Sequence, residues 1–231
     1  MLFDLRSKRR RHLVRIVYGL LALIMLGGLV LVGVGTGNNN GGILNAFTNN
    51  GSGGNQNSVV NQQVKAAVKK TEKDPNSGAA WANLVQARWT AAGTGSNYDS
   101  TTSAYTDSGK DQLRYATAAW TKYLSVTNDK PAVGTSFVAA HAYQALTKWS
   151  EASQVWQYVI DSEGPGTTAA LKGYLCTALT SYAAGQKSTA VLAQNEALKV
   201  ASKTEKLELK SDFSAAKASK ATAAQYAAGD C

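Results

Sequence analysis

The sequence predicts an all-α protein in which one N-terminal transmembrane helix precedes a domain of repeated helical hairpins. Three observations support this fold class. Residues 16–35 contain no charged side chain. The fifteen residues before that stretch contain six Lys or Arg and a single acidic residue. Beyond Pro75, apolar side chains recur at helical spacing, and the pattern repeats after about 38 residues.

The uncharged stretch is long enough to cross a membrane. Twenty residues rise about 30 Å as an α-helix, which matches the hydrocarbon core of a bilayer. The positive-inside rule keeps short basic flanks in the cytoplasm and sends the remainder outside. The residues that would set this topology are Arg6, Lys8, Arg9, Arg10, Arg11 and Arg15.

A cleaved signal peptide is the alternative for this segment. Its apolar region is shorter, about 7–15 residues, and ends in a small-residue cleavage site. Residues 32–35 (VGVG) match such a site poorly. We therefore expect an uncleaved signal anchor with the N-terminus in the cytoplasm and the C-terminal domain outside.

The net charge of +9 does not indicate a nucleic-acid-binding protein. Residues 1–15 carry +5 of it, which leaves +4 for the other 216 residues. That is an ordinary protein surface, and no basic stripe interleaved with aromatic residues is present in the sequence. The basic character belongs to the membrane flank.

The rest of the chain divides by composition. Residues 36–58 are rich in Gly, Asn and Ser, which predicts a disordered linker. Residues 59–216 carry the helical pattern and form the predicted domain. Leu209, Phe213 and Ala216 share one helical face and predict a helix that caps the array. Residues 217–231 are predicted to be a frayed polar tail.

The clearest repeat unit begins near Val133. Its first helix carries Ala140 and Tyr143, and its second carries Ala152 and Trp156. This arrangement resembles the tetratricopeptide repeat (TPR), a pair of antiparallel helices in about 34 residues. The family has a small residue, Tyr, Ala and an aromatic residue at these four positions. The resemblance implies that small side chains let the paired helices approach and that the aromatic rings fill the space between repeats.

Two further units complete a predicted TPR-like array of about three. The following unit has Ala178 and Ala190, and the preceding unit departs from the pattern at Val85 and Arg88. A surplus loop over residues 94–110 separates the two helices of that first unit, so its second helix is expected to resume only at Leu113. The repeat-packing residues that the resemblance implies are Trp81, Ala116, Trp120, Ala140, Tyr143, Ala152, Trp156, Ala178 and Ala190.

No combination of residues in the sequence predicts catalysis. His141 stands alone in a helix, and His12 lies in the basic head, so no two His or Cys have metal-ligand spacing. We expect a protein that is not an enzyme and needs no cofactor, metal or small-molecule substrate. Cys176 and Cys231 are expected to be a small buried side chain and a mobile thiol, with a disulfide as the alternative.

Binding is the function that a TPR array implies. In the family, the first helix of each unit lines a concave groove. Carried over by register, the groove residues are Gln86, Trp89, Phe137, His141, Gln144, Leu179 and Tyr182. The resemblance implies a membrane-tethered module that binds a protein or peptide partner at the outer face of the cytoplasmic membrane. A self-assembling structural protein without a separate client is the alternative, and the sequence leaves the oligomeric state open.

Overall fold

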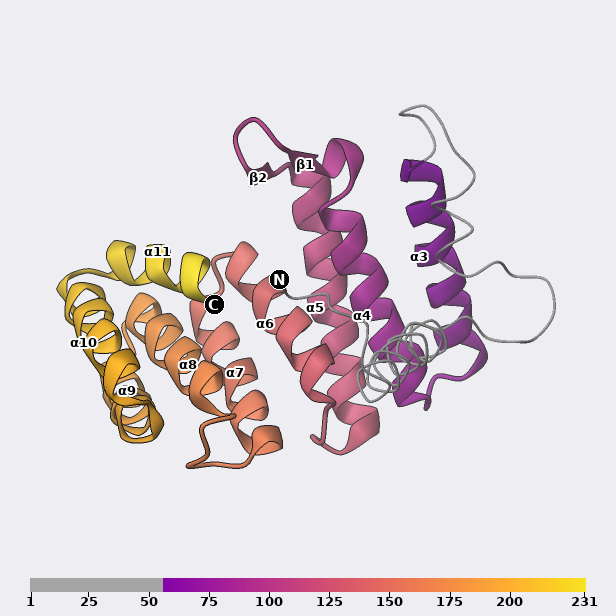
Figure 1. Ribbon diagram of the computed structural model, residues 1–231. Coiled ribbons are helices and arrows are strands. Elements are labelled where there is room, and N and C mark those ends of the chain that lie inside the picture. Colours follow the sequence, from indigo (N-terminus) through magenta and orange to yellow (C-terminus); the bar gives the residue numbers. More distant parts are fainter. Residues whose placement is uncertain (1–55) are drawn as a thin grey trace, which may run out of the picture. The chain divides into compact units, whose positions relative to one another are not determined.

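The computed structural model describes residues 56–231 (Figure 1). The predicted basic head, the membrane-spanning segment and nearly all of the predicted linker lie outside this range. No helix within the described range is both long and apolar enough to cross a membrane.

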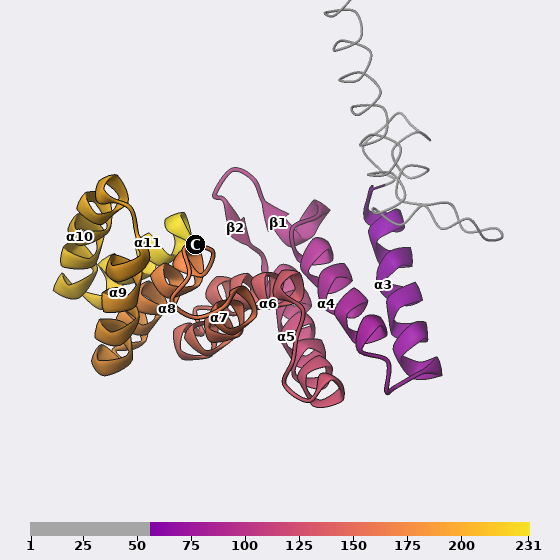
Figure 2. The same cartoon turned by 60° about the horizontal axis from the view of Figure 1, so that its bottom comes forward.

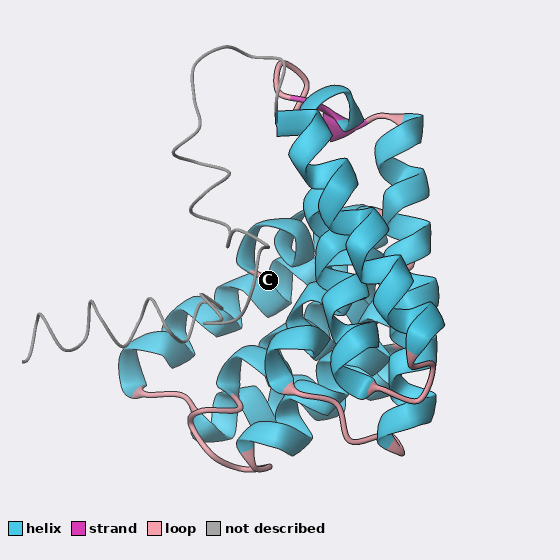
Figure 3. Cartoon of the chain, turned by 90° about the vertical axis from the view of Figure 1, so that its right-hand side faces the viewer, coloured by secondary structure: helices cyan, strands magenta, loops and turns pink. Residues whose placement is uncertain are grey.

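The described residues are almost entirely helical, which confirms the all-α prediction. Figure 3 shows that strands occur only in one small hairpin at an end of the α4–α5 pair. The helices are α3 (Gln56–Lys73), α4 (Gly78–Ala92), α5 (Asp107–Thr127), α6 (Val133–Ala145), α7 (Trp149–Glu163), α8 (Leu171–Ala184), α9 (Lys187–Val200), α10 (Lys203–Ala218) and α11 (Lys220–Asp230).

The three predicted helix pairs are present as α4–α5, α6–α7 and α8–α9, each packed on the next. Figure 2 shows them side by side in chain order between α3 and α10. Pairing depends on alanine at the contacts. Ala116, Ala140, Ala152, Ala178 and Ala190 are each completely buried, so the backbones of neighbouring helices approach closely.

Aromatic rings fill the space between the helices. Trp156 is fully buried and meets the Phe137 ring edge-on at a centroid distance of 5.1 Å. Trp120 is also buried, whereas Trp81 and Tyr143 are half-buried. Every residue predicted to pack the repeats is therefore at least half-buried.

Arg88 explains how the first pair departs from the expected pattern. Its Nη1 donates a hydrogen bond to Oε1 of Gln112 on α5, at 2.8 Å. The guanidinium carbon also lies 4.7 Å from the centre of the Tyr115 ring, a cation–π distance. An Arg thus occupies the interhelical space where the repeat pattern calls for Tyr.

The connection predicted as a surplus loop over residues 94–110 is present, but it ends earlier than expected and contains regular structure. A 3₁₀ turn, Gly95–Asn97, leads into a hairpin of β1 (Tyr98–Asp99) and β2 (Ala104–Tyr105), in which Tyr98 pairs with Tyr105. Helix α5 then begins at Asp107, six residues before Leu113. Gly109 permits this early start, because a Cβ there would lie 2.1 Å from the carbonyl oxygen of Asn97.

The prediction of a frayed C-terminal tail was wrong. Leu209, Phe213 and Ala216 are buried on α10, as expected for a capping helix. Ser219 then ends α10 and caps the next helix, since its Oγ accepts a hydrogen bond from the Thr222 amide at 3.0 Å. Helix α11 turns back from there and packs on α8 and α6 (Figures 1 and 2).

Phe213 should be essential to the capping helix. Replacing this ring, which is 1% exposed, with alanine leaves a cavity and should cost about 3–5 kcal/mol of unfolding free energy. Urea denaturation of the full chain in detergent, followed by circular dichroism, measures the loss. Leu207→Ala on the same helix is the control, because Leu207 is 73% exposed; equal losses for both would contradict this packing.

The capping box of α10 should make stability depend on pH. Ser202 donates its backbone N–H to the Glu205 carboxylate at 2.8 Å, and hydrogen bonds from Ser202 lower the pKa of Glu205. A lowered folded-state pKa stabilises the fold above the ordinary value near 4.5 and loses that effect as the pH falls. Wild type should therefore exceed Glu205→Gln in unfolding free energy near neutral pH, and the difference should shrink in acid. Glu208→Gln, outside the cap, controls for general charge effects.

Candidate partner-binding surface

An open hollow of about 350 Å³ lies between α4 and α6. Its lining is neutral and combines apolar with amide and hydroxyl side chains. Alanines at positions 82 and 132 and a glycine at position 134 take up little room and leave the space open. The larger lining side chains are Asn83, Val85 and Gln86 on α4, and Thr135 and Val138 on α6.

Trp89 lies about one turn beyond Gln86 on α4, and Phe137 directly precedes Val138 on α6. Both rings are half-buried. Trp89 lies 6.2 Å from the Tyr105 ring of the hairpin and 6.1 Å from the His141 ring, measured between centroids. Tyr105 of the hairpin therefore extends the ring contacts that Trp89 makes with His141.

Three of the predicted groove residues on the second and third helix pairs do not line an open groove. Gln144, Leu179 and Tyr182 are buried. The Gln144 Nε2 donates to the Ala227 carbonyl oxygen at 3.0 Å, and the Tyr182 hydroxyl donates to Gln194 on α9 at 2.7 Å. The prediction failed because α11 packs over α8 and α6, and because Tyr182 turns toward α9.

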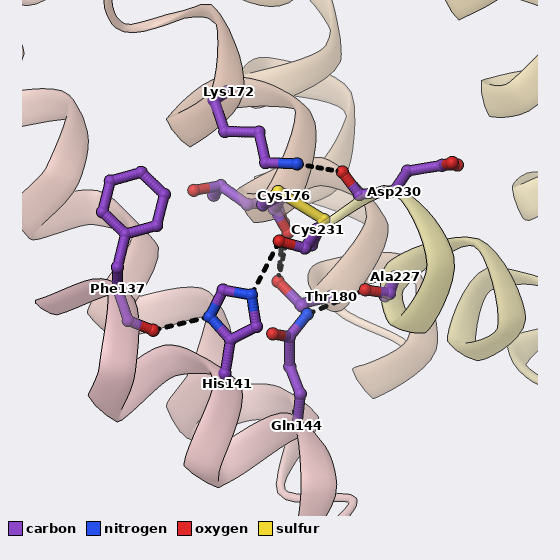
Figure 4. The surroundings of a disulfide bond; sticks show 10 residues. Phe137, His141, Gln144, Lys172, Cys176, Thr180, Ala227, Asp230 and Cys231 are labelled. Carbon is purple, nitrogen blue, oxygen red and sulfur yellow. Dashed lines mark hydrogen bonds between the residues drawn. A yellow bond between two sulfur atoms is a disulfide. The ribbon is translucent and has the colours of Figure 1, made fainter. Parts of the chain in front are cut away.

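Among the seven predicted groove residues, Gln86 lines the open hollow and is exposed. His141 is half-buried, and both of its ring nitrogens have a partner within the chain. Nδ1 is 2.6 Å from the Phe137 carbonyl oxygen, and Nε2 is 2.8 Å from the Cys231 carbonyl oxygen (Figure 4). Both partners are acceptors, so the ring donates to both only as an imidazolium, and the neutral ring donates to one.

Cys176 and Cys231 form a disulfide, so the expectation of two free thiols was wrong. Their Cα atoms are 5.5 Å apart although 55 residues separate them in sequence. Figure 4 shows the bond between α8 and the end of α11, beside His141, Gln144 and Lys172. The disulfide holds the end of α11 against α8.

A second hollow, of about 560 Å³, lies where α5, α6 and α7 meet. Trp120, Tyr143 and Tyr158 line it together with Glu151 and Asp161, and no Lys or Arg is in its lining. Burial raises the pKa of Tyr158, and the carboxylates of Asp129 and Asp161 add to that rise. Aromatic faces beside carboxylates suit a cationic side chain.

Within residues 56–231, no three His, Cys, Asp or Glu side chains lie close enough together to hold a metal ion. Comparisons with protein families, with curated proteins and with solved structures found no match. The fold alone therefore defines the class, an all-α protein built from packed helical hairpins.

Breaking the disulfide should destabilise the domain. A cross-link that closes a loop of 55 residues removes chain entropy from the unfolded state worth about 4 kcal/mol. Cys231→Ser should lose about that much unfolding free energy relative to the oxidised wild type, measured by urea denaturation of the full chain. Under dithiothreitol the two proteins should become nearly equal; a difference that persists after reduction would show that the loss comes from packing.

Proposed function

We propose that this chain is a membrane-tethered, TPR-like interaction module that binds a protein or peptide partner at the outer face of the cytoplasmic membrane. The open hollow between α4 and α6 carries the proposal, because no side chain of residues 56–231 fills it and it is lined by Asn83 and Gln86. A role in protein export or envelope protein folding follows from the architecture alone.

The packing supports a TPR-like array. Ala140, Ala152 and Trp156, which carry the sequence resemblance, are completely buried between helices. The small residues lie at helix contacts and the aromatic ring fills the space beside them, as the repeat pattern requires. The tether rests on sequence: residues 16–35 are uncharged and follow a basic flank.

The lining of the hollow indicates the chemistry of the partner. Its side chains carry no charge, so a charged peptide would lose hydration without gaining an ion pair. Side-chain amides at Asn83 and Gln86 can both donate and accept hydrogen bonds. The hollow therefore favours an uncharged peptide segment whose backbone bonds to these amides and whose apolar side chains rest on Val138, which is partly exposed. No catalytic step is assigned to the protein.

Filling the hollow should abolish capture of the partner. A Cβ added at Gly134 meets no atom within 4 Å, so Gly134→Trp places a large ring in the hollow without a steric conflict at the backbone. Crosslinking in membranes followed by pull-down should recover the partner of the wild type at least about tenfold less efficiently with this variant.

Gly134→Ala is the matched control, since it changes the same position without filling the space and removes the helix penalty of glycine. It should retain the partner. Equal recovery by the wild type, Gly134→Ala and Gly134→Trp would place the binding site elsewhere.

Self-assembly is the second candidate function. Leu192 on α9 and Leu207 on α10, at 69% and 73%, are the two most exposed large apolar side chains among residues 56–231 and are therefore the first to test for contact with a second copy. Size-exclusion chromatography of the full chain in detergent tests this: oligomers that dissociate in a Leu192→Ser/Leu207→Ser variant would favour a structural role.

A further inference from the structure

Helix α11 does not follow the order of the array. Each helix packs on the next one in the chain, and α11, besides its contact with α10, returns to lie across α8 and α6 (Figures 1 and 2). A single residue, Ser219, separates it from α10. The face of α6 and α8 therefore holds a helix that arrives from the end of the described chain.

The contact surface of α11 combines two buried alanines with Ala224 and Tyr226, which pack partly buried against the same cluster. Ala223 and Ala227, four positions apart and so on one face, are 0% and 1% exposed. Gln225, Ala228 and Gly229 are exposed on the other side. The two methyl groups alone bury little apolar area, and the partly buried Ala224 and Tyr226 side chains add to the contact.

Three side chains of the array bind the last turn of α11 by its backbone. The final four carbonyl groups of a helix have no partner within the helix. Gln144 donates to the Ala227 carbonyl, Lys172 to that of Asp230, and the His141 ring lies 2.8 Å from that of Cys231. Figure 4 shows the three side chains converging on this end from α6 and α8. Because these three side chains contact backbone oxygens, they recognise the end of a helix and do not depend on its side-chain sequence.

The disulfide is the covalent part of this attachment. Cys176 is fully buried on α8, and Cys231, one residue past α11, is partly exposed. A dithiol reductant can attack the Cys231 sulfur and release the Cys176 thiolate. Its second thiol then releases Cys231, so the reductant becomes a disulfide and both cysteines end as thiols.

We propose that the face formed by His141, Gln144, Lys172 and the α8 surface is a receptor for a partner helix that ends after two small residues spaced i, i+4. Helix α11 is its resident occupant, and reduction of the Cys176–Cys231 disulfide frees the face for the partner. This site is separate from the hollow between α4 and α6, and it does not depend on binding there.

The test uses the full chain in detergent and a fluorescent, amidated peptide with the sequence of residues 219–230. Ala227→Glu prevents docking of the chain's own α11, because a carboxylate would be buried among apolar groups. Reduced Ala227→Glu should bind the peptide by fluorescence anisotropy at least tenfold more tightly than the oxidised form. Ala228→Glu, with the same charge on the exposed side, should stay near wild type, since its own α11 competes.

Three controls keep the result specific. Ala223→Glu should repeat the behaviour of Ala227→Glu, in case one variant folds poorly. A peptide that carries Glu at the position of Ala227 should not bind. Gln144→Ala in the Ala227→Glu chain should weaken binding of the original peptide severalfold, through loss of one hydrogen bond to its carbonyl.

Hydrogen exchange of the wild type gives an independent reading. Reduction should increase exchange of the α11 amides at least tenfold more than it increases exchange of the α6 and α8 amides, which follow the global free energy of unfolding. Unchanged α11 protection, or peptide binding that is equal in all variants, would overturn the proposal. A reduced chain that elutes as a dimer and excludes the peptide would also overturn it and assign the face to α11 of a second copy.

Discussion

The close approach of helices over alanine is the constraint on which this structure depends. Five alanines at the helix contacts are completely buried, and a larger side chain at any of them would force two backbones apart. The few large rings then have defined places. Trp156 is enclosed by Phe137, at 5.1 Å, and by His141, at 5.5 Å between ring centroids. The buried alanines set the distance between neighbouring helices, and the aromatic rings fill the space that remains between them.

This packing divides the face formed by the first helices of the pairs into two parts. Between α4 and α6 the small residues leave a neutral hollow. Over α8 and the C-terminal half of α6, the same preference for small residues admits another helix, and α11 occupies that place. One face thus offers both an open surface and a surface covered by the chain itself. The two proposals assign separate binding properties to these parts.

Local sequence patterns were sufficient for most of the helical architecture. Helix ends carry their own signals, such as Ser202 with Glu205 at the start of α10. The spacing of Ala140, Ala152 and Trp156 predicted burial correctly because helical periodicity relates sequence spacing directly to a face. The same reasoning was wrong where it assigned Gln144, Leu179 and Tyr182 to an open groove, because these side chains are buried. Periodicity indicates which residues share a face, but it does not indicate what covers that face.

The sequence by itself determined the all-α class, the three helix pairs and the residues that pack them, because these depend on contacts between neighbouring parts of the chain. Only the tertiary structure decided the disulfide between Cys176 and Cys231, the return of α11 and the hydrogen bonds from His141 and Gln144 to its end. Those contacts join residues 55 to 90 positions apart. Their formation depends on how the whole array brings α6, α8 and α11 together, and no local spacing encodes that distance.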